Sequence, residues 1–198
     1  MEPRKRFRPK GGYKPGKATK RTASPGNDAA GLNTRRLGAN EYVLLEPEAA
    51  MDRIEDIQEV HVMMQADELD IARDELLYLV ADCKGFLEAH NLLGMLAIEE
   101  GDIPLARGHF GFAYESGLAS LPKDFSGRLP WEKEYNSHFF DAGRGLARCL
   151  VAIGKVDEAR EVLEKLTAFD PSEPNVAALL AELNEPPAPE GKSPCAES

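Results

Sequence analysis

Residues 146–171, LARCLVAIGKVDEAREVLEKLTAFDP, decide the fold of this 198-residue chain. Apolar residues recur at helical spacing on both sides of Gly154, and a helix with such a stripe buries one face. Gly154 itself supplies the positive-φ backbone that commonly ends a helix. The stripe before it is formed by Leu146, Ala147 and Leu150, and the stripe after it by Ala159, Leu163 and Leu166. The stretch therefore predicts two antiparallel helices joined by a tight turn.

Residues 93–113, LGMLAIEEGDIPLARGHFGFA, repeat this arrangement. In both copies a glycine precedes a small alanine by five residues, and a large apolar residue follows that alanine by four. The corresponding residues are Gly101, Ala106 and Phe110 in this copy, and Gly154, Ala159 and Leu163 in the other. A small alanine lets two helices approach closely, and Asp102 is a suitable cap for the second helix. The body of the chain is therefore predicted to be built from repeated helical hairpins.

These positions resemble the signature of the tetratricopeptide repeat (TPR) family, whose unit is a helix–turn–helix of 34 residues. The resemblance implies units at about 53–86, 87–120 and 140–173, an insert at 121–139 and a capping helix at 174–184. The first unit is placed by Ala72, which lies 34 residues before Ala106. The fold class expected is all-α, a TPR-type solenoid of about three hairpins plus the capping helix, with disordered termini.

The formal net charge of −10 is the sum of two unlike parts. Residues 1–40 carry eleven Lys and Arg and two acids, a net +9, whereas residues 41–198 carry 13 basic and 32 acidic residues, a net −19. Because the first part holds few large apolar residues and many Gly and Pro, we expect a disordered basic arm over 1–40. Residues 185–198 contain four prolines and are expected to form a disordered tail, which leaves 41–184 as the helical domain.

Several classes of function are disfavoured by what the sequence contains. No stretch approaches the apolar length of a membrane helix, and the three cysteines have no spacing typical of a disulfide framework. The four histidines have no partners at metal-ligand spacing, and no nucleophile or phosphate-loop motif occurs. We therefore expect a non-enzymatic, cytoplasmic protein without a metal or cofactor, for which a small-molecule substrate is disfavoured.

The family resemblance implies a groove, lined by the first helix of each unit, that binds a segment of another protein. The groove positions of the family fall on Glu88, Asn91, Met95 and Ile98 in the second unit and on Asp141, Arg144, Arg148 and Val151 in the third. Arg144 and Arg148 are one helical turn apart, so both guanidinium groups could face a partner carboxylate. The alternative is that they pair with acids of this chain.

Two other segments offer binding chemistry. In the insert, Trp131 and Tyr135 could anchor an interface, or Trp131 could seal the gap that the insertion makes in the stack. The arm carries cations suited to RNA or another polyanion: Arg4, Lys5, Arg6, Arg8, Lys10, Lys14, Lys17, Lys20 and Arg21. The first hypothesis is a protein-binding scaffold or adaptor. The alternative is an RNA- or DNA-associated protein in which the arm binds the polyanion and the repeats recruit a partner.

Overall fold

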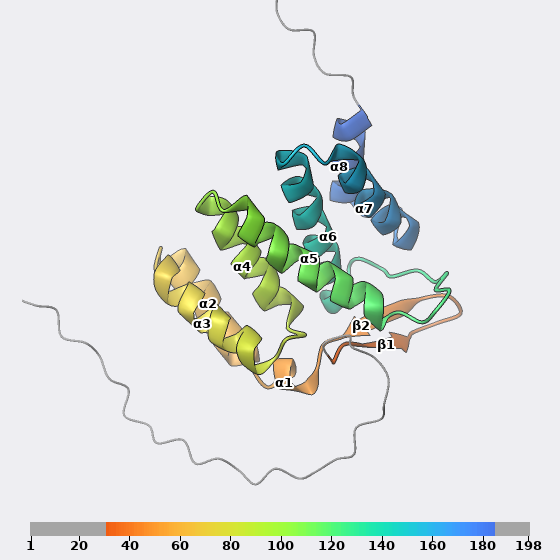
Figure 1. The fold of residues 1–198 in the computed structure, drawn as a ribbon. Coiled ribbons are helices and arrows are strands. Elements are labelled where there is room, and N and C mark those ends of the chain that lie inside the picture. The colour runs from red at the N-terminus through yellow and green to blue at the C-terminus, as the bar shows by residue number, and fades with distance from the viewer. Residues whose placement is uncertain (1–30, 185–198) are drawn as a thin grey trace, which may run out of the picture.

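A computed structural model describes residues 31–184. Within this range the chain forms two short strands and eight helices, drawn in Figure 1. In chain order they are β1 (Asn33–Arg36), β2 (Tyr42–Leu45), α1 (Glu48–Met51), α2 (Ile54–Gln65), α3 (Leu69–Asp82), α4 (Leu87–Glu99), α5 (Ile103–Ser120), α6 (Glu134–Ala152), α7 (Val156–Phe169) and α8 (Pro174–Asn184).

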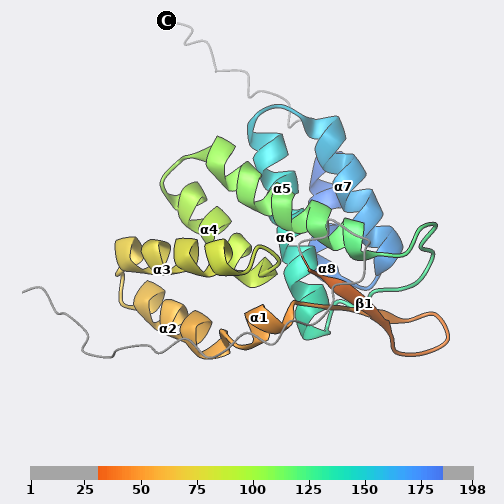
Figure 2. The ribbon, with the colours of Figure 1, turned by 60° about the horizontal axis from the view of Figure 1, so that its bottom comes forward.

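The helices after α1 form three hairpins and a closing helix. The pairs α2–α3, α4–α5 and α6–α7 follow one another in a stack, and α8 packs against α7 (Figures 1 and 2). The first helices of successive hairpins also meet, since α4 packs against α6. The prediction of an all-α, TPR-type stack of three hairpins with a capping helix is confirmed.

The turn inside each hairpin has the same hydrogen bonds. Gly101 and Gly154 take φ values of +77° and +78°, as their positions in the sequence predict. The next residue then donates its N–H to a carbonyl five residues earlier, from Asp102 to Ala97 at 2.8 Å and from Lys155 to Leu150 at 2.9 Å. This is the Schellman arrangement, which satisfies carbonyls at the helix end. In the first hairpin the left-handed position is held by Asp67, with φ 60°.

Close helix packing depends on small residues placed opposite large ones. Ala106 and Ala159 are fully buried, as expected for the positions where paired helices touch. The ring of Phe110 on α5 lies against Gly94 on α4 and against Gly145 on α6. Three helices from two hairpins therefore meet at a single aromatic side chain.

Two boundaries differ from the prediction. Residues 33–36, placed in the disordered arm, form a strand that pairs antiparallel with β2, with Asn33 opposite Leu45 and Arg36 opposite Tyr42. The strand pair is stabilised by contacts distant in the sequence, because β2 packs against α6 and Leu44 is fully buried. In addition, α6 begins at Glu134, so the insert is a loop over 121–133 and its last predicted residues are helical. The rest of the arm, 1–30, and the tail, 185–198, lie outside the described residues.

Candidate functional site

A cavity of about 370 Å³ lies where α2, α4 and α6 face one another, and we call it the groove. Its wall includes seven of the eight residues that the sequence predicts for a binding groove, namely Glu88, Asn91, Met95, Ile98, Asp141, Arg144 and Arg148. The eighth, Val151, lines a neighbouring cavity of about 220 Å³ between α6, α7 and α8, which we call the end cavity. Arg148 lines both, so the two cavities are adjacent along α6.

The two arginines of the groove have different surroundings. Arg144 binds the carboxylates of Asp141 and Glu173, and the side chain of Glu173 is fully buried. The positive charge of Arg144 is therefore balanced within the chain, as the alternative interpretation predicts. Arg148, one turn later, is exposed and has no acidic partner among residues 31–184. Of the two groove arginines, Arg148 therefore offers a guanidinium group whose charge is not balanced by an acid within residues 31–184.

Asn91 has an unused hydrogen-bond acceptor in the groove wall. Its side chain is 6% exposed, and its Nδ2 donates to the backbone oxygen of His138 at 2.8 Å. Within the described part of the chain, its Oδ1 is the buried side-chain polar atom that no donor reaches. An unmet buried acceptor costs about 1–3 kcal/mol, which a donor would recover.

At the end of the groove near α1, two histidines and two glutamates form a chain of contacts that no pattern in the sequence indicates. His61 Nε2 lies 2.7 Å from Glu88 Oε1, and His138 Nδ1 lies 3.2 Å from Glu46 Oε1. Burial by itself would lower the pKa of His138, but the neighbouring carboxylates, first that of Glu46, outweigh it and raise that pKa. These residues are separated by 27 and 92 positions in the sequence, so no local spacing could have linked them.

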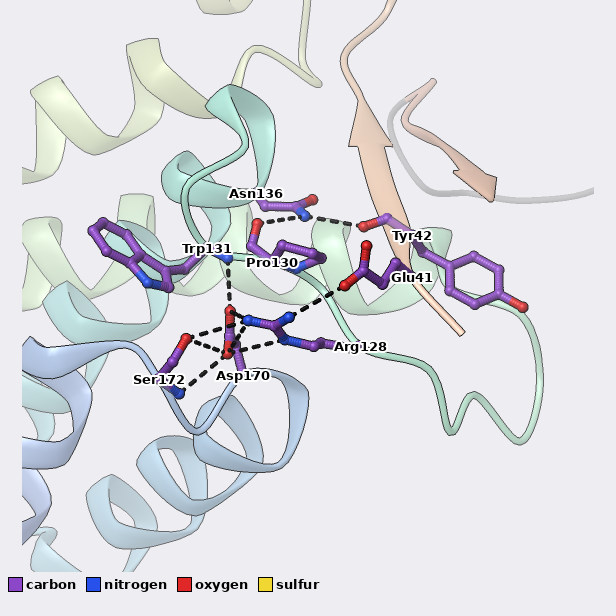
Figure 3. Close-up of polar contacts among 8 residues, drawn as sticks. All are labelled: Glu41, Tyr42, Arg128, Pro130, Trp131, Asn136, Asp170 and Ser172. Atoms are coloured by element: carbon purple, nitrogen blue, oxygen red, sulfur yellow. Dashed lines mark hydrogen bonds and ion pairs between the residues drawn. The ribbon is translucent and has the colours of Figure 1, made fainter. Parts of the chain in front are cut away.

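The insert is fastened to the body through Asp170, as Figure 3 shows. Arg128 donates to both carboxylate oxygens of Asp170, at 3.2 and 3.3 Å, and the backbone N–H of Trp131 donates to it at 2.9 Å. Burial would raise the pKa of Asp170, but hydrogen bonds from Trp131, Ser172 and Arg128 outweigh it and lower the pKa. The carboxylate therefore remains ionised while it joins the insert to the turn before α8.

Trp131 and Tyr135, the two residues predicted to anchor an interface at the insert, are part of the folded body of the protein. Both side chains are partly buried and pack against the main hydrophobic core. Nearby, Asn136 donates to the carbonyls of Tyr42 and Pro130 at 3.1 and 3.0 Å (Figure 3). Its side-chain oxygen accepts a hydrogen bond from the backbone N–H of Leu44 at 2.8 Å. This geometry favours the interpretation that Trp131 seals the gap made by the insertion.

The remaining predicted features concern the arm and metal binding. The cationic residues from Arg4 to Arg21 lie outside the described residues. Over residues 31–184, no group of three or more His, Cys, Asp or Glu side chains is arranged to hold a metal ion. In the same range no helix combines the length and the apolar character needed to cross a bilayer.

The stacked hairpins and the groove between their first helices define a helical-repeat protein. A model of the tetratricopeptide repeat family matches residues 134–183, which cover α6, α7 and most of α8. This match supports a tetratricopeptide repeat protein, the family that the sequence pattern resembles. A search of curated proteins gave no match. Repeats of this family generally mediate protein–protein interaction and are typically non-catalytic.

Proposed function

We propose that this protein is a non-enzymatic scaffold or adaptor that binds a segment of another protein in the groove between α2, α4 and α6. The observation that carries the proposal is the uncompensated charge of Arg148 at a cavity lined by the first helices of three hairpins. A guanidinium group binds carboxylates with two parallel hydrogen bonds. We therefore expect the partner segment to carry an acidic side chain.

The other walls of the groove support the same proposal. Met95 and Ile98 are exposed on α4 and give the groove an apolar wall opposite Arg148. Asn91 fixes this wall to α6, because its Nδ2 donates to the backbone oxygen of His138. A peptide segment with an acidic side chain and apolar side chains would complement Arg148 and the apolar wall.

The test compares groove variants with matched variants on α5. Met95 and Leu105 are each 47% exposed, but Leu105 does not line the groove. Met95→Lys and Arg148→Glu should each weaken binding of proteins captured from the native cells, whereas Leu105→Lys and Arg107→Glu should leave it unchanged. All four side chains are exposed, so the variants are expected to stay within about 0.5 kcal/mol of the original stability.

The readout is the dissociation constant of each captured protein, measured with purified components. Loss of one interfacial ion pair or one apolar contact typically costs about 1–2 kcal/mol, so affinity should fall roughly tenfold. Equal affinity of the groove variants and the α5 variants for every captured protein would contradict binding in the groove.

A further inference from the structure

The end cavity leaves apolar surface open at the last hairpin. Its wall is formed by α6, α7 and α8 and is mainly apolar, with Arg148 and Glu182 as its charged residues. Its apolar members are Ala147, Val151, Leu163, Leu179 and Leu183. Val151 is 40% exposed there. Contiguous apolar surface of this kind commonly marks a place where another segment binds.

The chain leaves α8 beside this cavity. Leu183, in its wall, is the penultimate residue of α8, and the next residues are EPPAPE at 185–190. Proline has a fixed φ and no N–H, so a proline-rich segment loses little conformational freedom when it binds in an extended form. Its rings are apolar enough to cover the floor of the cavity. The segment therefore suits the surface next to which it begins.

The length and the charge of this segment also suit the end cavity. Seven residues from Leu183 to Glu190 span about 22 Å in a polyproline conformation, which is more than two helix-packing distances of about 8–10 Å. Residues 185–198 carry three glutamates and one lysine, a net −2, while Arg148 at the rim lacks an acidic partner in the described structure. The basic residues 1–30 would instead be repelled by Arg148.

We propose that residues 185–190 fold back over α8 and lie extended in the end cavity. Their prolines cover Val151, Leu179 and Leu183, and a glutamate carboxylate binds Arg148. Because Arg148 also lines the groove, the segment competes there with a partner's acidic residue. This competition rests on the groove function proposed above, whereas the docking of the segment does not.

Cys195 allows a direct test in the full-length protein. The other two cysteines, Cys83 and Cys149, are 4% and 1% exposed, and burial raises the pKa of both thiols, so neither competes for a thiol reagent. A nitroxide attached to Cys195 should broaden the amide NMR signals of Val151 and Leu183 and cause a measurable loss of their intensity. Signals of the first hairpin, such as that of Val62, should keep theirs.

Charge reversal identifies the contact. Arg148→Glu should abolish the broadening, and the same variant combined with Glu185→Lys and Glu190→Lys should restore it. Arg107→Glu, on α5, is the matched control and should leave the broadening unchanged. The spectra of the variants also report whether the fold is intact.

Two results would overturn the proposal. One is the absence of selective broadening at the end cavity in the original protein. The other is found by mixing ¹⁵N-enriched chains that carry no nitroxide with nitroxide-labelled chains of natural isotope content. Broadening in this mixture would show that the segment in the cavity belongs to a second copy of the chain. Both measurements are made without a partner, so they can fail while the groove function stands, and the groove function can fail while the segment still docks.

Discussion

One methyl group added at Gly145 should disturb the packing between α4, α5 and α6. A Cβ atom on Gly145 would lie 2.4 Å from Cδ1 and 2.5 Å from Cε1 of Phe110. The ring cannot retreat, because on α4 a Cβ at Gly94 would lie only 2.7 Å from its other edge. Gly145→Ala should therefore force α5 and α6 apart or push the ring off its preferred rotamer.

Two opposing effects set the magnitude. Overpacking of a buried site typically costs about 1–3 kcal/mol, while replacing a helical glycine by alanine returns up to about 1 kcal/mol. The net loss should be about 1–2 kcal/mol in the free energy of unfolding. For a chain of this size that corresponds to a fall in Tm of about 3–6 °C.

Gly108 on α5 provides the control, because it is exposed and a Cβ there would meet nothing within 4 Å. Gly108→Ala should raise stability by about 0.5–1 kcal/mol. In addition, Phe110→Leu should cost less in the Gly145→Ala protein than in the original one, because a smaller side chain relieves the overlap. Urea unfolding followed by circular dichroism measures the stabilities of the original protein and of the four variants. If Gly145→Ala proved as stable as the original protein, the argument from ring confinement would be wrong.

Three further predictions concern the turns, the histidines and the insert. Asp67→Gly should raise Tm by about 1–4 °C, because glycine adopts the left-handed φ of 60° without strain; an unchanged or lower Tm would contradict this. Burial lowers the pKa of His90 from 6.5 to about 4 and also lowers that of His109. The unfolded chain therefore takes up protons at a higher pH than the folded chain, and His90 alone should remove about 3 kcal/mol of stability as the pH drops from 6.5 to 4; urea midpoints should show a shallower loss for His90→Leu. Asp170→Asn should cost about 2–3 kcal/mol and shift the fluorescence of Trp131 to the red, because the donors Trp131 N–H and Arg128 lose a buried carboxylate; unchanged emission would show that Asp170 does not hold Trp131 in place.

The parts of the fold that could be predicted from sequence are those set by local spacing. Gly101 and Gly154 each determine a turn within a few residues of themselves. Ala106 and Ala159 are small for the same local reason, and they are fully buried where paired helices touch. The groove residues were placed by the resemblance to the tetratricopeptide repeat family, and they share a face because positions three and four apart lie on the same side of any helix.

The parts that could not be predicted depend on contacts between distant residues. The strand at 33–36 forms because its partner strand is held by Asn136, more than 90 residues away, and not because four residues in a Gly-rich segment favour a strand. The pairing of Arg144 depends on Glu173, which is 29 residues away and buried in the turn before α8. Local spacing thus predicted where a side chain lies but not what neutralises it.

The early start of α6 connects the insertion to the groove. The added turn at 134–139 carries Asn136, which joins β2 to Pro130 of the insert, and His138, which lines the groove and contacts Glu46 just after β2. Both contacts come from one helical turn, so the insert, the strand pair and the groove wall share a common support. The extra residues between the second and third repeats therefore do more than lengthen a loop: they bring the segment before the first hairpin against the helix that forms one wall of the groove.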